Sequence, residues 1–151
     1  MLMQNLPEFS LPATGGTLFQ SDKLKRKRLI LYSYPKDNTP GCSTEAMQFR
    51  DHYAEFQQFD FEVFGISRDS LKSHDSFKAK LELPFELLSD SEEIAGQLFA
   101  VIKMKNLYGK QVRGIERSTF LFDKKGKLLK EWRGVKVPNH VPEVLEYLKS
   151  L

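Results

Sequence analysis

The feature of this chain that most constrains its fold is the alternation of short apolar runs with segments of helical periodicity. Such runs are typical of buried strands, and apolar residues repeated every three or four positions are typical of amphipathic helices. The predicted strands span residues 29–34, 61–67, 87–90, 118–122 and 127–132. This order predicts an α/β fold, in which a mixed sheet is flanked by helices on both faces and the last two strands form an antiparallel hairpin.

Helical periodicity fills the segments between these strands. The first helix begins at Cys42, and its apolar stripe continues through Ala46, Phe49, Tyr53 and Phe56. Further helices are predicted over 70–80, after a cap near Asp90 or Ser91, and at the C-terminus, where one face carries Val137, Val141, Val144, Leu145, Leu148 and Leu151. Residues 1–28 are predicted to be irregular apart from a small hairpin, and residues 100–113 to form a loop broken at Gly109.

Length and composition add further limits. The 151 residues fit a single domain over 1–151 that can bury a core without disulfides or structural metal. The net charge of +3 is too small to indicate a polyanionic partner. The sequence shows neither a basic stretch followed by an apolar run at its start nor an apolar run of about 20 residues. We therefore expect a cytosolic protein.

The only cysteine, Cys42, stands where the first helical pattern begins. A thiol at a helix N-terminus faces unpaired backbone N–H groups and the positive end of the helix dipole, which favour its thiolate form. Because the thiolate is the nucleophile, reactive cysteines occur at such positions. A single cysteine taken alone is more often a small buried apolar residue. The residues around Cys42 therefore decide between the two interpretations.

A strand followed by a helix that carries cysteine in its first turn is a thioredoxin-like arrangement. The usual redox pair there is CxxC, whereas this chain reads Cys42-Ser43-Thr44-Glu45. Dithiol exchange within the motif is therefore excluded. What remains is the chemistry of one thiol, namely attack on a peroxide with formation of a sulfenic acid.

Pro35, Thr39 and Cys42 match the PxxxTxxC pattern of peroxiredoxins. The longer stretch YPKDNTPGCSTEAMQFRD resembles the bacterioferritin comigratory protein group, the Q-type peroxiredoxins. Further matches are 108–121 and 135–141, so the resemblance covers nearly the whole chain. It implies a thioredoxin-like fold of the peroxiredoxin type. It also implies a thiol-dependent antioxidant peroxidase that reduces hydrogen peroxide and organic hydroperoxides without a cofactor.

The resemblance also implies roles for individual residues. Cys42 corresponds to the peroxidatic cysteine, which attacks the terminal peroxide oxygen. Thr39 would orient the peroxide through its hydroxyl, and Pro35 would shield the thiolate from bulk water. Arg117, expected on a strand, would lie beside Cys42 and stabilise both the thiolate and the developing alkoxide. Glu45, one turn into the helix, would organise the loop or Arg117.

The chain departs from the pattern at the resolving cysteine. Many members of the group carry it five residues after the peroxidatic one, and that position is Met47 here. Because no second cysteine exists, the sulfenic acid cannot be closed by an intramolecular disulfide. The protein is therefore expected to be a one-cysteine peroxiredoxin that an external thiol recycles, such as thioredoxin, glutaredoxin or glutathione. The resemblance further implies a monomer or weak homodimer.

Other interpretations remain open. Cys42 could serve as an oxidation switch in a redox-sensing or chaperone-like binding protein with negligible turnover. The basic run at 23–28 could contact nucleic acid, although a solvated loop is favoured there. His52, His74 and His140 show no second ligand at metal-site spacing, so they are interpreted as structural or solvent-facing and no metal is predicted.

Overall fold

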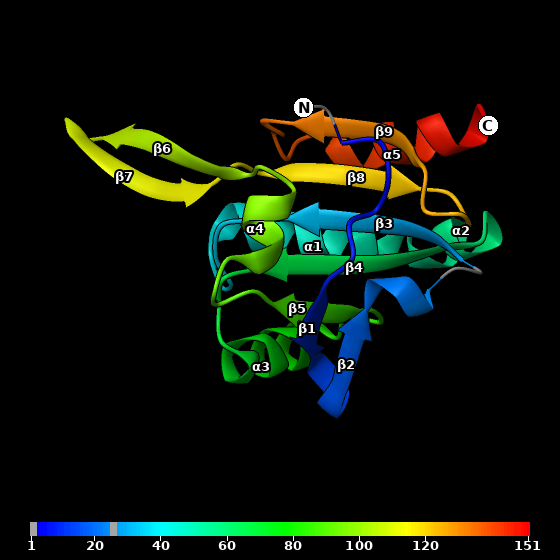
Figure 1. Cartoon of the computed structure of the whole chain (residues 1–151), viewed down its shortest axis with the longest axis horizontal. Helices are drawn as coiled ribbons and strands as arrows, with labels where there is room; N and C mark the ends of the chain where they lie inside the picture. The colour runs from blue at the N-terminus through cyan, green and yellow to red at the C-terminus, as the bar shows by residue number, and fades with distance from the viewer. Residues whose placement is uncertain (1–2, 25–26) are drawn as a thin grey trace.

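The computed structural model of the chain describes residues 3–24 and 27–151 (Figure 1). The strands are β1 (Ser10–Ala13), β2 (Thr17–Gln20), β3 (Arg28–Ser33), β4 (Phe61–Ser67), β5 (Glu86–Ser89), β6 (Ile102–Leu107), β7 (Lys110–Ile115), β8 (Ser118–Phe122) and β9 (Leu128–Arg133). The helices are α1 (Pro40–Asp51), α2 (Tyr53–Gln58), α3 (Leu71–Leu81), α4 (Ile94–Leu98) and α5 (His140–Lys149).

The strands form a mixed sheet, as the sequence predicts. Within the described residues, seven strands make one sheet in the order β2-β1-β5-β4-β3-β8-β9, and β6 pairs with β7 in a separate ribbon. β3, β4 and β5 run parallel to one another, whereas β8 runs antiparallel to both β3 and β9. β1 and β2 form the small N-terminal hairpin, which joins the sheet through β5.

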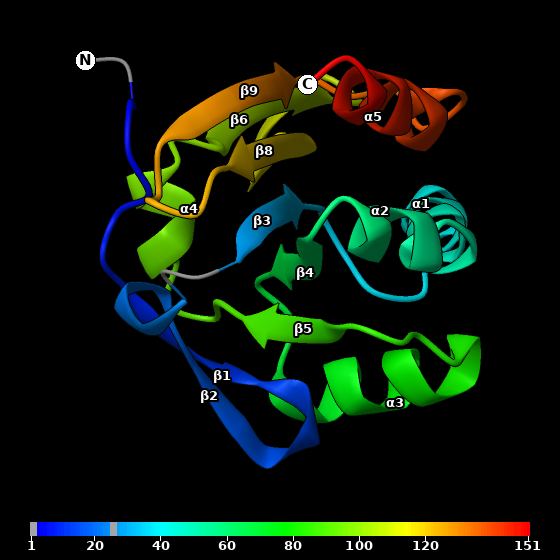
Figure 2. The ribbon, with the colours of Figure 1, turned by 90° about the vertical axis from the view of Figure 1, so that its right-hand side faces the viewer.

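Helices cover the two faces of this sheet unequally (Figure 2). α1, α2, α3 and α5 lie on one face, and α4 lies on the other with the N-terminal segment. The central strand β3 contributes side chains to the cores on both faces of the sheet, because successive side chains of a strand point in opposite directions. Ile30 and Tyr32 enter the core under α1, while Leu29 and Leu31 enter the core under α4. This two-sided burial explains why β3 is an uninterrupted apolar run in the sequence.

The predicted first helix is divided at His52. α1 ends at Asp51 and α2 begins at Tyr53, with His52 at φ −104° and ψ 6° between them. The amide of His52 still donates to the Gln48 carbonyl over 3.2 Å, so the chain continues in nearly the same direction. Because the apolar stripe continues across the break, Phe56 remains buried and its spacing in the sequence gives no sign of the interruption.

The prediction of a loop over 100–113 is wrong, because β6 and β7 form a hairpin there. Tyr108 and Gly109 connect the strands with φ values of 52° and 78°, which is the positive-φ pair that a two-residue hairpin turn requires. The ribbon projects away from the body of the protein (Figure 1). Its side chains are largely exposed, so no alternation of apolar and polar residues marks the strands in the sequence.

Two further predictions need correction or restriction. The last helix begins at His140 and ends at Lys149, so Val137 precedes it and the exposed Leu151 follows it. The basic run at 23–28 includes Lys25 and Arg26, which lie outside the described residues. In the described part of the chain, none of the helices has the length and apolar character needed to span a bilayer.

Gly65 on β4 gives a direct test of packing beneath α1. A Cβ atom at this position would lie 2.9 Å from the Tyr32 ring and 2.9 Å from Leu87 Cδ2, both in the tightly packed core. Gly65→Ala should therefore lower the free energy of unfolding by about 1–3 kcal/mol. Gly114→Ala is the matched control, because its Cβ would meet only the flexible Lys105 side chain at 3.4 Å or more. Urea unfolding of both variants measures the difference, and equal stabilities would contradict this packing.

Candidate active site

Cys42 is the third residue of α1, whose N-cap is Thr39. The first backbone hydrogen bond of the helix runs from the Ser43 amide to the Thr39 carbonyl over 2.9 Å. Pro40 has no N–H group, so the amides of Gly41 and Cys42 are the donors left at the helix start. Together with the positive end of the helix dipole, they place favourable charge around the sulfur. The Cys42 side chain is itself only 2% exposed.

Arg117 contacts both the sulfur and a buried carboxylate. Its Nη2 lies 3.3 Å from Cys42 Sγ, and its Nη1 donates to Glu45 Oε1 over 2.6 Å. A Cβ atom on Gly41 would lie 3.4 Å from Nη2, so the guanidinium packs against the first turn of α1. Arg117 lies between β7 and β8 and not on a strand, which corrects the position expected from the sequence.

The sheet register brings Arg117 to the thiol. Ser33, the last residue of β3, pairs with Ser118, the first residue of β8. The chain before β8 therefore lies beside the chain that leaves β3 toward Cys42. A hydrogen bond of 2.9 Å from the Val135 amide to the Arg117 carbonyl holds the backbone of that segment. Residues that are 75 positions apart in the sequence meet through this pairing.

The charges around the sulfur follow from burial and pairing. Burial would lower the pKa of Arg117, but the neighbouring Glu45 and Cys42 outweigh it and raise this pKa above its ordinary value. His140 at the start of α5 contacts Thr119 Oγ1 through Nε2 over 2.8 Å. Burial and the charge of Arg117 lower the pKa of His140 to about 4, so its imidazole is neutral at pH 7. Among the described residues, Arg117 is thus the cation in contact with this thiol.

Glu45 is a buried carboxyl that titrates near neutrality. Burial raises its pKa to about 7, although the charge and the hydrogen bond of Arg117 act in the opposite direction. Oε1 accepts from Arg117, whereas Oε2 is buried without a hydrogen-bond partner among the described residues. The proton that Glu45 takes up therefore resides on Oε2, and Oε1 can accept from Arg117 in both charge states.

The titration of Glu45 predicts a pH dependence of stability. Because the pKa rises from 4.5 to about 7 on folding, the stabilising contribution is complete below pH 4.5 and is lost as pH rises through about 7. The shift corresponds to about 3 kcal/mol. We expect the free energy of unfolding to fall by roughly that amount between pH 5 and pH 8 relative to a Glu45→Gln variant. Urea unfolding at both pH values measures this, and parallel pH profiles would contradict it.

Thr39 and Pro35, the other site residues implied by the resemblance, lie in the segment that joins β3 to α1. Thr39 donates its hydroxyl hydrogen to the Lys36 carbonyl over 2.8 Å, which leaves the Thr39 oxygen available as an acceptor. Pro35 is half-buried in the loop that follows β3. Met47 is half-buried on α1, about 7.5 Å further along the helix axis than Cys42.

His74 lies close to two carboxylates, those of Asp37 and Asp69. His74 is fully buried on α3, and its Nδ1 lies 2.7 Å from Asp37 Oδ2. Ligand atoms of His74, Asp37 and Asp69 lie within 4.8 Å of one another, but these atoms are already engaged in hydrogen bonds inside the protein. These three residues therefore form a hydrogen-bonded cluster. The motif YPKD places Asp37 beside Pro35, but only the fold shows that Asp37 reaches His74.

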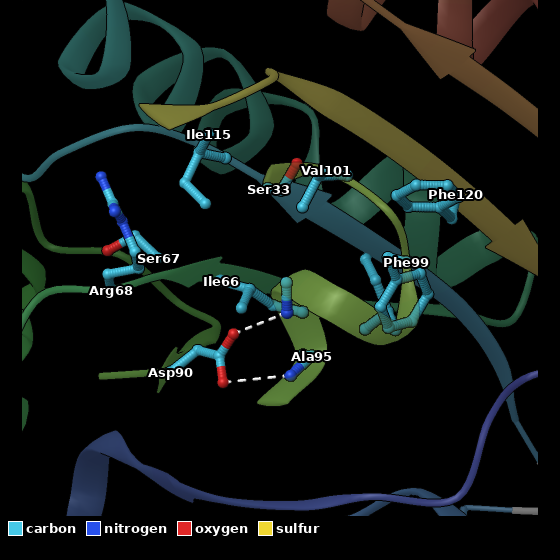
Figure 3. A pocket seen from close by; sticks show the side chains of 12 residues that line it. Ser33, Ile66, Ser67, Arg68, Asp90, Ala95, Phe99, Val101, Ile115 and Phe120 are labelled. Carbon is cyan, nitrogen blue, oxygen red and sulfur yellow. Dashed lines mark hydrogen bonds between the residues drawn. The ribbon is translucent and has the colours of Figure 1, made fainter. Parts of the chain in front are cut away.

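A small apolar pocket is lined by residues of the core under α4 (Figure 3). Cys42 belongs to the core under α1, so the pocket lies on the opposite face of the sheet from the thiol. It is enclosed by α4, the ends of β3 and β4, and Phe99, Val101 and Phe120. Asp90 closes one side, where its carboxylate accepts from the amides of Ala95 and Gly96 at the start of α4. The pocket has room for about one water molecule, and because it lies across the sheet from the sulfur it is not part of the site around Cys42.

Fold and site together define a thioredoxin-fold protein with one buried thiol at a helix start beside an arginine. Solved structures agree with this class. Xanthomonas campestris peroxiredoxin Q has a TM-score of 0.91 and 44% identity, with 97% of each chain covered. Mycobacterium tuberculosis BcpB has a TM-score of 0.86 and 28% identity, with 99% of each chain covered. These neighbours confirm the predicted thioredoxin-like fold of the peroxiredoxin type.

Sequence comparison places the chain more narrowly. The sequence pattern of the AhpC/TSA family matches residues 2–130. The peroxiredoxin Bcp of Bacillus subtilis is 47% identical over 148 residues, which cover 98% of this chain and 94% of that protein. The chain therefore belongs to the AhpC/TSA family, as a member of the Q-type or bacterioferritin comigratory protein group of peroxiredoxins. It is a one-cysteine member, since Cys42 is its only cysteine.

Proposed function

We propose that this protein is a thiol peroxidase that reduces hydrogen peroxide and organic hydroperoxides through a sulfenic acid on Cys42. The observation that carries the proposal is the contact of 3.3 Å between Arg117 Nη2 and Cys42 Sγ at the start of α1. A merely structural buried cysteine has no need of a guanidinium and free helix amides around its sulfur. A solved relative, the Xanthomonas campestris bacterioferritin comigratory protein, is described by its alkyl peroxide reduction activity and is 43% identical.

In the first half-reaction, the Cys42 thiolate attacks the terminal oxygen of the peroxide. A sulfur–oxygen bond forms and the O–O bond breaks. The leaving alkoxide, or hydroxide in the case of hydrogen peroxide, takes a proton and becomes an alcohol or water. Arg117 and the amides of Gly41 and Cys42 stabilise the charge that develops on the leaving oxygen. The hydroxyl oxygen of Thr39 accepts a hydrogen bond from the peroxide O–H and orients it. Pro35 keeps bulk water away from the sulfur.

Recycling requires a thiol from outside the chain. A first thiol attacks the sulfenic sulfur and releases water, which gives a mixed disulfide. A second thiol then attacks this disulfide and returns Cys42 to its reduced form. Because the sulfur is only 2% exposed, a protein thiol reaches it only when the start of α1 opens locally. We place thioredoxin first among the reductants, with glutathione and glutaredoxin as the alternative.

The first half-reaction is tested by mixing the reduced protein with stoichiometric hydrogen peroxide in stopped flow and trapping the product with a sulfenic-acid reagent. We expect a rapid reaction and a single adduct that mass spectrometry locates at Cys42. Protein alkylated beforehand at its only cysteine is the control, and it should neither react nor form an adduct. A rate no faster than that of an ordinary thiol would contradict the peroxidase proposal.

The lack of a second cysteine also favours a second candidate, a redox switch in which Cys42 oxidation changes binding without turnover. Steady-state peroxide consumption separates the two functions. Rapid consumption with thioredoxin and its reductase, or with glutathione and glutaredoxin, supports the peroxidase and identifies its reductant. Rapid sulfenate formation without turnover in either system supports the switch.

A further inference from the structure

The loop that carries Pro35 and Thr39 is held from the inside by Asp37. The neighbouring Lys36 and Asn38 are exposed, whereas Asp37 is only 4% exposed. Its carboxylate therefore points into the protein, toward α3. Asp37 thus attaches the loop between β3 and α1 to the interior of the protein, and the groups that bind Asp37 determine how far the loop can move.

Four groups bind Asp37. Its Oδ1 accepts from the Tyr34 hydroxyl over 2.7 Å, and its Oδ2 accepts from Ser73 Oγ over 2.8 Å. His74 Nδ1 lies 2.7 Å from the same Oδ2. The backbone amide of Asp37 donates to Asp69 Oδ2 over 2.9 Å. The middle of the loop is therefore fixed to α3 and to the connection between β4 and α3.

The contacts of His74 define where its protons are. Nε2 lies 2.9 Å from the carbonyl oxygen of Leu88, which can only accept, so Nε2 carries a hydrogen. The contact of 2.7 Å between Nδ1 and Asp37 also needs a hydrogen, because otherwise two lone pairs would face each other. A neutral imidazole beside an ionised carboxylate cannot satisfy both contacts. The pair therefore holds one additional proton.

The surroundings place this proton on the imidazole. Burial would raise the pKa of Asp37, but hydrogen bonds from His74, Tyr34 and Ser73 outweigh it and hold this pKa below its ordinary value. The other groups that face the ring are the carboxylate of Asp69, the phenol of Tyr34 at 3.5 Å and the carbonyl of Leu88 on β5. These groups are negative or accept hydrogen bonds, so they offset the desolvation of the fully buried ring, and the contacts are those of a buried ion pair between His74 and Asp37.

We propose that the buried His74 imidazolium is a positioning residue of the peroxidase, which acts through Asp37 to fix the loop that presents Thr39 and Pro35 to the peroxide. The backbone carbonyl of Lys36, the residue before Asp37, accepts a hydrogen bond from the Thr39 hydroxyl. A shift of Asp37 therefore also moves the Thr39 hydroxyl, which orients the peroxide. The inference rests on the proposed function. It differs from the role of Arg117, because His74 sets the geometry of the loop and Arg117 acts on the sulfur.

The test compares two reactions of the same sulfur. Hydrogen peroxide needs the positioned loop, whereas iodoacetamide alkylates the buried thiolate whenever the start of α1 opens and needs no group that orients it. In His74→Gln we expect the rate constant with hydrogen peroxide to fall about 10- to 100-fold, while that with iodoacetamide does not fall, because a looser loop does not hinder access to the sulfur. His52→Gln is the matched control, because His52 is partly exposed and, among the described residues, its side chain is hydrogen-bonded only to Glu55. It should leave both rate constants unchanged.

A second variant keeps the proposal testable if His74→Gln fails to fold. Ser73→Ala removes one hydrogen bond to Asp37 and keeps the ion pair, so it should lower the peroxide rate in the same direction but by less. Histidine ¹⁵N spectra of the wild-type protein at neutral pH should show His74 protonated on both nitrogens. A neutral ring, or folded variants with an unchanged ratio of the two rates, would overturn the positioning role alone. A wild-type protein without a fast peroxide reaction would instead overturn the proposed function and this role with it.

Discussion

Replacement of Cys42 by serine is expected to abolish peroxide reduction. The serine hydroxyl stays protonated at neutral pH, so it offers no nucleophile for the O–O bond. Because Cys42 is the only cysteine, the variant contains no other thiol that could take over the reaction. The measurement is peroxide consumption in the presence of each reductant system. The expected rate is that of the same mixture without the protein.

The fold should survive this replacement. Serine is nearly the same size as cysteine, and Arg117 can donate to its oxygen as it does to the sulfur. We expect cooperative thermal unfolding with the same circular dichroism spectrum as the wild-type protein. Residual peroxide consumption by the folded variant would show that another group carries the chemistry, and the assignment of Cys42 would then be wrong.

Arg117→Met is expected to have the second-largest effect. Loss of the guanidinium removes the cation at 3.3 Å from the sulfur, and loss of one charge-stabilising donor typically costs about 10²–10³ in rate. It also leaves the fully buried Glu45 without its partner, which destabilises a folded protein by about 3–5 kcal/mol while the carboxyl is ionised. Stopped-flow kinetics and urea unfolding at pH 8 measure the two effects separately.

A double variant separates catalysis from stability at this ion pair. Glu45→Gln combined with Arg117→Met removes the unpaired buried charge, so we expect most of the lost stability to return. The rate of the peroxide reaction should stay low, because the positive charge beside Cys42 is still missing. Recovery of the rate together with stability would mean that Arg117 supports the fold and contributes little to the reaction itself.

Much of this architecture is predictable from the sequence because it depends on local patterns. β3 and β4 agree with their predicted spans within one residue, since both are apolar runs bounded by polar or turn residues. Cys42 at the start of α1 follows from the same logic. The ribbon of β6 and β7 was not predictable, because exposed strands need no apolar alternation.

The contacts of the site depend on pairings between distant residues. The resemblance to peroxiredoxins implies that Arg117 lies beside Cys42, but the register of Ser33 with Ser118 is what brings it there. The contact of Asp37 with His74 joins two segments that each look ordinary in the sequence. Neither spacing nor composition predicts this contact, because it depends on how α3 packs against the loop after β3.

Position 47 carries methionine and not a resolving cysteine, and this changes the rate law of the proposed cycle. A chain with its own resolving cysteine converts its sulfenic acid to a disulfide in an intramolecular step, whose rate does not depend on the concentration of external thiol. Here that step is bimolecular, so the lifetime of the oxidised protein is inversely proportional to the concentration of reducing thiol. The fraction of oxidised molecules at steady state then reports the ratio of peroxide to reductant. The oxidation state of one sulfur atom thereby becomes a measure of the redox balance around the protein.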